Sequence, residues 1–206
     1  MSKPRSPRAE NSSSAGACSW PGSNPLMVQY HDREWGRPIR DDRKIFEFLV
    51  LESAQAGLSW VTILRKREGD RRAFAGFDPR RVARFSARDV ARLLKNPGIV
   101  RNRLKIEAAI NNAGKFLEVQ KEFGTFNKYM WGFVGGRPID GKRKGLKSLP
   151  SVTKESEVFA RDLRWRGFKF LGPTVIYAHM QAVGMVNDHI QTCFRHNALK
   201  LQNKLI

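Results

Sequence analysis

Residues 93–103 read Leu-Leu-Lys-Asn-Pro-Gly-Ile-Val-Arg-Asn-Arg, which predicts two helices joined by a tight turn. The Pro-Gly pair ends the first helix, and Asn102 is suited to cap the second. Successive backbone N–H groups in such a turn, together with a helix N-terminus, suit a phosphate oxygen. Gly98 lacks a side chain that would hold a phosphate backbone away. We therefore expect Gly98, Val100 and Arg101 to contact DNA, although an ordinary αα-hairpin would carry the same Pro-Gly pair.

The sequence around this hairpin is strongly basic. The 206 residues include 38 Lys and Arg against 19 Asp and Glu, a formal net charge of +19. Residues 61–105 hold 14 Lys or Arg and 4 Asp or Glu, so this segment carries more than half of the excess. Such a concentration indicates a polyanionic partner, either nucleic acid or an anionic membrane surface, and the hairpin in the same segment favours DNA. A solvated basic surface and RNA are alternatives. Membrane binding is disfavoured because no basic amphipathic helix has a wide apolar face.

Helix signals follow one another on both sides of the hairpin. Residues that favour N-caps precede apolar positions at helical spacing, and these are Asp41, Ser59, Ser86, Asn102 and Thr125. Two further helices are expected over about 153–166 and 174–183, each ending before a glycine. No alternating strand pattern continues beyond a few residues. The sequence therefore predicts an all-α fold in one compact domain.

The domain boundaries follow from composition. Residues 1–17 are rich in Ser, Pro, Arg and Ala and predict a disordered basic tail. The folded domain is expected over 18–195, with 196–206 as a C-terminal tail, and 137–147 predict a basic loop. The absence of a long apolar run and of a secretory signal, together with only two cysteines, favours an intracellular protein of the cytoplasm or nucleoid. No feature indicates an oligomer, so we expect a monomer.

Four metal-binding side chains lie near the two ends of the chain. They are Cys18, His31, His189 and Cys193. The last two are four residues apart and share one helical face, and the set as a whole suits a closed tetrahedral zinc site. Such a site would join the terminal segments without taking part in chemistry. On spacing alone, buried cysteines and hydrogen-bonded histidines explain the same residues, and His179 and His196 are rival ligands.

Two segments combine aromatic residues with a carboxylate. Residues 30–36 read Tyr-His-Asp-Arg-Glu-Trp-Gly, and residues 51–60 read Leu-Glu-Ser-Ala-Gln-Ala-Gly-Leu-Ser-Trp. Aromatic faces can sandwich a nucleobase, and a carboxylate such as Glu52 can accept hydrogen bonds from its edge. The alternative is that the tryptophans belong to the core and that Glu52 pairs with an arginine. A non-catalytic DNA-binding module would keep the basic face but would not need Glu52 beside Trp60.

Taken in order, these segments resemble the DNA-3-methyladenine glycosylase I family. The resemblance runs from Cys-Ser-Trp at 18–20 through both aromatic motifs and Gly-Ile-Val-Arg-Asn-Arg at 98–103. It continues through Gly-Phe-Lys-Phe-Leu-Gly-Pro-Thr at 167–174 to Val-Asn-Asp-His at 186–189. It implies a helix-hairpin-helix DNA glycosylase fold with a zinc site joining the terminal segments. It also implies a monofunctional enzyme that flips 3-methyladenine out of alkylated DNA and hydrolyses its N-glycosidic bond.

The resemblance also implies roles for individual residues. It gives the zinc ligands as Cys18, His31, His189 and Cys193, in preference to His196. It makes Glu52 the catalytic and base-reading carboxylate. It places Trp20, Tyr30 and Trp60 around the base, and Leu58 in the gap that the base leaves in the duplex.

The chain departs from the family pattern at a few positions. Met27 stands where some members have a tyrosine at the pocket rim, and Ser53-Ala54 replaces a Gly-Gln pair. Many members of the wider superfamily carry a catalytic aspartate after the hairpin. The corresponding stretch 115–119 holds Glu118 and no aspartate. The resembled subfamily is expected to lack that aspartate, so Glu118 is given no role.

Overall fold

The computed structural model of the chain describes residues 18–202. The predicted tail over 1–17 and residues 203–206 lie outside the described residues. Its elements, in chain order, are α1 (Pro25–Arg33), α2 (Asp42–Gln55), α3 (Trp60–Ala73), η1 (Ala75–Phe77), α4 (Pro79–Val82), α5 (Ala87–Leu94), α6 (Arg103–Phe123), α7 (Phe126–Gly132), β1 (Ile139–Asp140), η2 (Leu146–Ser148), α8 (Lys154–Trp165), α9 (Pro173–Ala182), β2 (Val186–Asn187) and α10 (Phe194–Gln202).

The predicted helix starts are confirmed by their caps. Asp41 accepts a hydrogen bond from the Lys44 backbone N–H at 2.8 Å, which begins α2. Asn102 does the same for α6 with the Lys105 N–H at 3.1 Å. Ser59, Ser86 and Thr125 occupy the cap positions of α3, α5 and α7. Four of these caps, Asp41, Ser59, Asn102 and Thr125, accept a hydrogen bond from a backbone donor that the first helical turn leaves free, so local sequence determines these boundaries.

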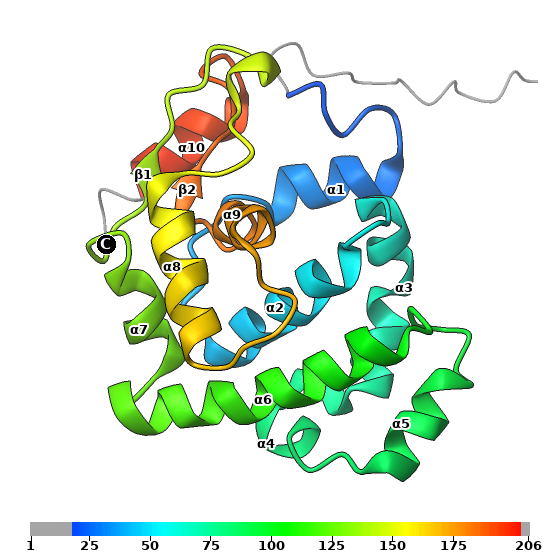
Figure 1. Cartoon of the computed structure of the whole chain (residues 1–206). Helices are drawn as coiled ribbons and strands as arrows, with labels where there is room; N and C mark the ends of the chain where they lie inside the picture. The colour runs from blue at the N-terminus through cyan, green and yellow to red at the C-terminus, as the bar shows by residue number, and fades with distance from the viewer. Residues whose placement is uncertain (1–17, 203–206) are drawn as a thin grey trace, which may run out of the picture.

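Helix α2 is the central element of the fold. Every residue from Ile45 to Ser53 is buried, because α3, α6, α7 and α9 pack around it. Figure 1 shows the long α6 along one side of α2, with α7 and α8 at one end and α3 to α5 at the other. The core around α2 is aromatic, and Phe116 stacks on Phe126 with ring centroids 4.0 Å apart. None of the described helices has the length and hydrophobicity needed to cross a membrane.

Several short elements were not predicted, among them α1, β1 and β2. Helix α1 begins at Pro25 after Asn24, whose side chain accepts from the Leu26 N–H at 3.1 Å. The strands β1 and β2 pair in parallel over only two residues each, which is too short for an alternating pattern to appear in sequence.

The C-terminal boundary also differs from the expected one. Helix α10 extends to Gln202, and it buries Arg195, His196 and Leu199. The expected tail at 196–206 therefore begins inside a packed helix. Among the described residues from 196 onward, Leu199 is the only fully buried apolar one, so the periodicity in the sequence is weak.

A buried histidine in α9 predicts acid sensitivity. His179 is fully buried, and neither ring nitrogen has a hydrogen-bond partner among the described residues. Burial lowers the pKa of His179 to about 3. Below about pH 6.5 the His179 imidazole is protonated in the unfolded chain but stays neutral in the folded protein. The free energy of unfolding therefore falls by about 2 kcal/mol as the pH is lowered to 5.

Replacing this residue tests the effect. We expect His179→Leu to lose less stability than wild type between pH 7 and pH 5, by the amount attributed to His179. Urea unfolding at both pH values measures the free energy of unfolding. The matched control is His196→Leu, because His196 pairs with Asp140 at 2.9 Å and is not an isolated buried imidazole. An identical pH dependence in wild type and His179→Leu would show that His179 is hydrated or paired in solution.

Candidate active site

The junction between α2 and α3 places a carboxylate and an indole close together. Glu52 lies in the last turn of α2, and Trp60 is the first residue of α3. Gly57 turns the chain between them with φ of +77°, a conformation that other residues rarely adopt. The exposed Leu58 therefore lies on the loop that joins the two helices.

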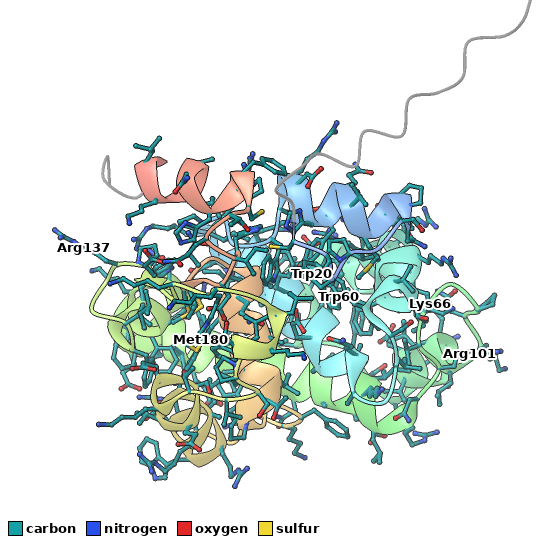
Figure 2. The ribbon with its side chains drawn as sticks, turned by 90° about the horizontal axis from the view of Figure 1, so that it is seen from above. Trp20, Trp60, Lys66, Arg101, Arg137 and Met180 are labelled. Atoms are coloured by element: carbon teal, nitrogen blue, oxygen red, sulfur yellow. The ribbon has the colours of Figure 1, made fainter. Side chains whose placement is uncertain are left out.

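A pocket of about 230 Å³ opens at this junction. It is lined by Trp20, Met27, Tyr30, Trp35, Glu52, Gln55, Trp60, Leu149, Ala178 and Gln181. The structure thus brings together all four residues predicted to bind a base, from the N-terminal segment, α1, α2 and α3. Figure 2 shows Trp20 and Trp60 beside each other near the middle of the molecule. The residues predicted to contact DNA, Leu58, Gly98, Val100 and Arg101, do not line the pocket.

The aromatic residues form a continuous wall. Tyr30 contacts Trp60 with ring centroids 5.3 Å apart, and Trp20 contacts Trp35 at 5.0 Å. The indole N–H groups of Trp20 and Trp60 are buried without a hydrogen-bond partner among the described residues. A wall of this kind offers flat apolar faces for a planar ligand and two unused donors near them.

Two buried glutamates on α2 have opposite electrostatic surroundings. Glu47 accepts hydrogen bonds from Lys44, Arg67 and Arg71 at 2.7–2.9 Å. Burial opposes ionisation of this carboxylate, but Arg67 and Lys44 outweigh it and lower the pKa. Glu52 has no ion pair or hydrogen-bond partner for its carboxylate among the described residues, so the expected alternative of an arginine partner is wrong. Burial raises the pKa of Glu52 to about 8. An unpaired carboxylate in an aromatic pocket favours a cationic or hydrogen-donating ligand.

An ion-pair network holds the helices around the pocket. Arg67 of α3 binds both oxygens of Glu34 at 2.9 and 2.7 Å and one oxygen of Glu47 at 2.7 Å. It thereby connects the end of α1, which carries Tyr30, to α2 and α3. Because the guanidinium is fixed by two carboxylates in a planar arrangement, it orients these elements as well as neutralising charge.

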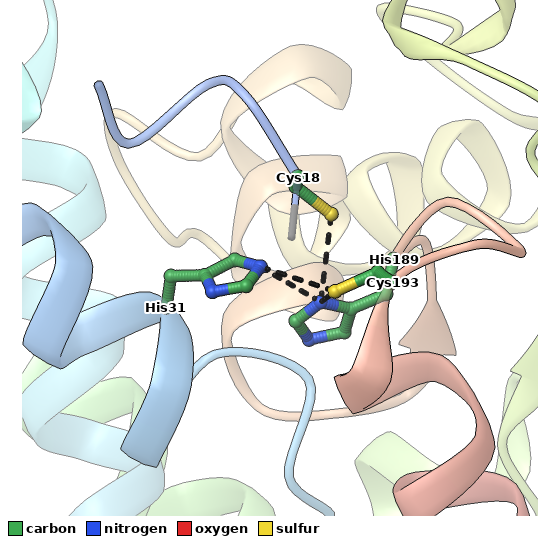
Figure 3. A group of neighbouring side chains, drawn as sticks. All are labelled: Cys18, His31, His189 and Cys193. Atoms are coloured by element: carbon green, nitrogen blue, oxygen red, sulfur yellow. Dashed lines mark hydrogen bonds between the residues drawn. The ribbon is translucent and has the colours of Figure 1, made fainter. Parts of the chain in front are cut away.

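The four predicted metal ligands form one buried cluster, although they come from both ends of the described chain. Their ligand atoms all lie within 4.8 Å of one another (Figure 3). Cys193 Sγ lies 3.5 Å from His189 Nδ1 and 3.6 Å from His31 Nε2, and Cys18 Sγ lies 3.7 Å from His189 Nδ1. These three distances match the edges of about 3.3–3.8 Å that tetrahedral zinc with two sulfur and two nitrogen ligands has. The cluster could therefore hold a metal ion.

Outer contacts orient both imidazoles toward the centre of the cluster. His31 Nδ1 lies 2.6 Å from Asp32, and His189 Nε2 lies 3.1 Å from the carbonyl oxygen of Trp35. Each histidine thus has one nitrogen free to face the ligand set, as in protein metal sites. His196 pairs with Asp140 and His179 lies in the core, so neither rival belongs to the cluster.

The cluster also supports the pocket. Trp20 follows Cys18 by two residues, and Tyr30 directly precedes His31. Trp35, which lines the pocket, accepts a hydrogen bond from His189 through its backbone. Any change that loosens the cluster should therefore disturb the aromatic wall.

The hairpin between α5 and α6 presents free backbone donors. The backbone N–H groups of Val100 and Arg101 make no hydrogen bond among the described residues, and they precede the N-terminus of α6. The Gly98 N–H, in contrast, donates to Asn96 Oδ1 at 2.8 Å, so it is not available for a phosphate. Two adjacent donors beside a helix N-terminus form a site for an anion. Figure 2 places Arg101 and Lys66 at the same edge of the molecule.

The hairpin packs against the helices whose residues line the pocket. Lys66 of α3 donates to the carbonyl oxygen of Pro97 at 2.8 Å. A Cβ on Gly69 would lie 2.2 Å from the carbonyl oxygen of Gly98, so only glycine permits this approach. Lys105 of α6 donates to the carbonyl oxygens of Ala54 and Ala56 at 2.8 and 2.6 Å, directly before the loop with Leu58.

A single methyl group should therefore disturb the hairpin. We expect Gly69→Ala to weaken binding of undamaged duplex DNA by about tenfold, the equivalent of one or two phosphate contacts. Fluorescence anisotropy at fixed salt measures this affinity. Gly114→Ala is the control, since a Cβ there meets nothing within 4 Å and alanine favours the helix. Equal affinities for the two variants would contradict the role of this contact.

Sequence reasoning missed part of the pocket. Ala178 and Gln181 lie three residues apart on α9, and Leu149 follows η2. The α9 pair follows the Gly-Pro start of a helix that was predicted, but no local signal indicated which of its faces meets the pocket. Leu149 lies just after the segment 137–147, which the sequence suggested only as a basic elaboration.

Comparison with known proteins agrees with the fold. The profile of the methyladenine glycosylase family matches residues 20–196. DNA-3-methyladenine glycosylase 1 of Escherichia coli is 44% identical over 176 residues, which is 85% of this chain and 94% of that protein. A crystal structure of 3-methyladenine DNA glycosylase I, 47% identical, matches 86% of this chain and 98% of its own with a TM-score of 0.84.

A third comparison concerns ligand recognition. A 3-methyladenine DNA glycosylase I from Staphylococcus aureus, solved to define its recognition of 3-methyladenine, is 37% identical and covers 87% of this chain. The match spans 96% of that chain with a TM-score of 0.85. The chain described here belongs to the methyladenine glycosylase family.

Proposed function

We propose that the chain is a DNA repair glycosylase that excises 3-methyladenine from alkylated double-stranded DNA. The reaction is hydrolysis of the N-glycosidic bond, which releases the free base and leaves an abasic site. The observation that carries the proposal is Glu52, an unpaired buried carboxylate in a pocket walled by indole and phenol rings. The names of the relatives support the same substrate.

The chemistry of the lesion explains why a site with a single carboxylate and no strong general acid is sufficient. Methylation at N3 makes the base cationic in the nucleotide, so it leaves as a neutral purine without prior protonation. The enzyme then needs no strong general acid, and its task is to extrude the base and stabilise positive charge as the bond breaks. Trp20, Tyr30 and Trp60 would enclose the flipped base. Glu52, once ionised, would accept hydrogen bonds from its edge and stabilise the cationic transition state.

The surface beside the pocket would hold the duplex. The free N–H groups of Val100 and Arg101 would bind a backbone phosphate, which is the role of a helix-hairpin-helix motif. Gly98 would contribute indirectly, because its backbone packs closely against Gly69 and so positions the turn. The exposed Leu58, held near the hairpin by Lys105, would enter the space that the flipped base leaves.

The Cys₂His₂ cluster would bind structural zinc. The donor set, its burial and its near-tetrahedral spacing fit this ion better than a hard cation. Zinc there would join the N-terminal segment to the start of α10 and would supply no chemistry to the reaction. The remaining proposals are that the enzyme acts as a monomer inside the cell and that it does not cut the strand.

Chromatography of the products tests the proposal. Duplex DNA treated with a methylating agent is incubated with the protein, and the released bases are separated. We expect free 3-methyladenine in excess of spontaneous depurination, with strands that stay intact until alkali is added. DNA binding without release of any methylated base would indicate a binding module, and strand cleavage without alkali would contradict a monofunctional enzyme.

A further inference from the structure

A polar network on α9 and β2 reaches the wall of the pocket opposite α2. Gln181 lines the pocket, and its side-chain nitrogen donates to Asp188 at 2.7 Å. Asp188 is buried and directly follows β2. The same carboxylate accepts a hydrogen bond from Arg143 Nε at 2.7 Å and another from the hydroxyl of Tyr177.

These contacts fix which end of the Gln181 amide faces the pocket. The carboxylate of Asp188 is surrounded by donors, so only the amide nitrogen of Gln181 can make a favourable contact with it. Arg143 also binds the Tyr177 hydroxyl at 3.1 Å, so the phenol proton is directed to Asp188. The amide oxygen of Gln181 has no partner among the described residues and is left for a ligand.

We infer that Gln181 is a specificity-determining residue, whose amide oxygen accepts a hydrogen bond from the exocyclic amino group of the base in the pocket. The inference rests on the proposed function and extends it to the choice among purines. A 6-amino purine offers a donor to this oxygen, whereas a 6-oxo purine places a second oxygen against it. A site built to accept a hydrogen bond rejects a ligand that lacks the donor more strongly than an apolar wall does.

The basic loop takes part in the same arrangement. Arg143 lies in the segment 137–147, and its side chain reaches the carbonyl oxygen of Ser148 at 3.4 Å, next to the pocket residue Leu149. Gly141 packs so closely on Asp188 that a Cβ there would lie 2.0 Å from the carboxylate. The loop therefore closes over Asp188 and helps to set the orientation of Gln181.

Binding of two free bases to the protein tests the inference. The probes are 3-methyladenine and 3-methylhypoxanthine, which differ in the 6-amino and 6-oxo groups, and quenching of the pocket tryptophans reports binding. We expect wild type to favour 3-methyladenine by at least tenfold, and Gln181→Met to lower this ratio by about tenfold. The control Gln29→Met makes the same change at an exposed glutamine of α1 that does not line the pocket, and it should keep the wild-type ratio.

A second variant tests the orientation itself. In Asp188→Asn the oxygen of the new amide stays with Arg143, so its nitrogen faces Gln181. The Gln181 amide should then turn over and present its N–H groups, which shifts the preference toward 3-methylhypoxanthine. Loss of stability alone would lower both affinities equally and would leave the ratio unchanged.

The outcomes separate this inference from the proposed function. An unchanged ratio in both Gln181→Met and Asp188→Asn, with wild type binding 3-methyladenine, overturns the role of Gln181 and leaves the glycosylase assignment in place. Equal losses of preference in Gln181→Met and Gln29→Met also overturn it. A wild-type protein that binds neither base and releases none from methylated DNA contradicts both the inference and the proposed function.

Discussion

Glu52→Gln should lower the rate of 3-methyladenine release by about a hundredfold while leaving affinity for undamaged duplex nearly unchanged. The amide keeps the shape of the side chain but cannot carry the negative charge that stabilises the cationic base and sugar. Single-turnover assays on methylated DNA, at enzyme concentrations that saturate the duplex, measure the effect on the bond-breaking step.

The same substitution should stabilise the fold. With a pKa of about 8 in the folded protein and about 4.5 when unfolded, ionisation of Glu52 removes stability as pH rises between these values. Glu52→Gln should therefore raise the free energy of unfolding by up to about 3 kcal/mol at pH 7. Loss of activity combined with a gain in stability distinguishes a functional carboxylate from a structural one.

Glu47 supplies the matched control on the same helix. Glu47→Gln removes a charge that three cations bind, so it should lower stability by about 3 kcal/mol or more. The release rate per folded molecule should stay within a few fold of wild type. If Glu47→Gln and Glu52→Gln lost activity to the same extent, the loss would reflect the fold and not the pocket.

The rate should also depend on pH through Glu52. If the ionised carboxylate is the active form, kcat/KM rises with pH and levels off above about pH 8, the pKa of the free protein. Glu52→Gln should show no such rise. A wild-type profile that is flat between pH 6 and pH 9 would exclude the ionised carboxylate as the group that limits the reaction.

Removing one metal ligand should have the largest effect on stability. The cluster joins residues 171 positions apart, Cys18 and His189. Closing a loop of this length stabilises a fold by up to about 5 kcal/mol on entropic grounds. We expect Cys193→Ala to lose the bound metal, to melt well below wild type and to release 3-methyladenine more slowly, because the cluster supports Trp20 and Tyr30.

Metal analysis by mass spectrometry, with thermal melts before and after chelation, measures this prediction. Wild type should carry one zinc per chain and should lose stability when it is stripped. The control His196→Ala removes a nearby imidazole that is not in the cluster, so metal content should be retained. A metal-free wild type whose melting temperature is unaffected by Cys193→Ala would contradict a structural metal.

Local signals in the sequence predicted most of the fold. Asp41, Ser59 and Asn102 each cap a helix through their own side chains, so the prediction needed no knowledge of distant contacts. Helix α10 and the two-residue strands could not be predicted in this way. They are stabilised by contacts between segments far apart in sequence, such as His196 with Asp140 and Ile139 with Val186.

The same distinction between local signals and long-range contacts applies to the residues of the candidate site. Glu52, Trp60 and the cluster residues belong to compact motifs that the resemblance could identify. No sequence signal marks Gln181, because its proposed role depends on contacts with Asp188 and, through it, with Arg143. Arg143 lies in the loop over 137–147, which the sequence indicated only as a basic surface. The free N–H groups of Val100 and Arg101 were predicted, whereas the contact of Gly98 with Gly69 required the packed structure.

The most direct test of the account is a crystal structure of the protein soaked with 3-methyladenine. The account predicts the base in the pocket between Trp20, Tyr30 and Trp60, with Glu52 and the amide oxygen of Gln181 within hydrogen-bond distance of its edge. A base bound elsewhere at saturating concentration, or one that contacts the aromatic wall but not Glu52, would contradict it.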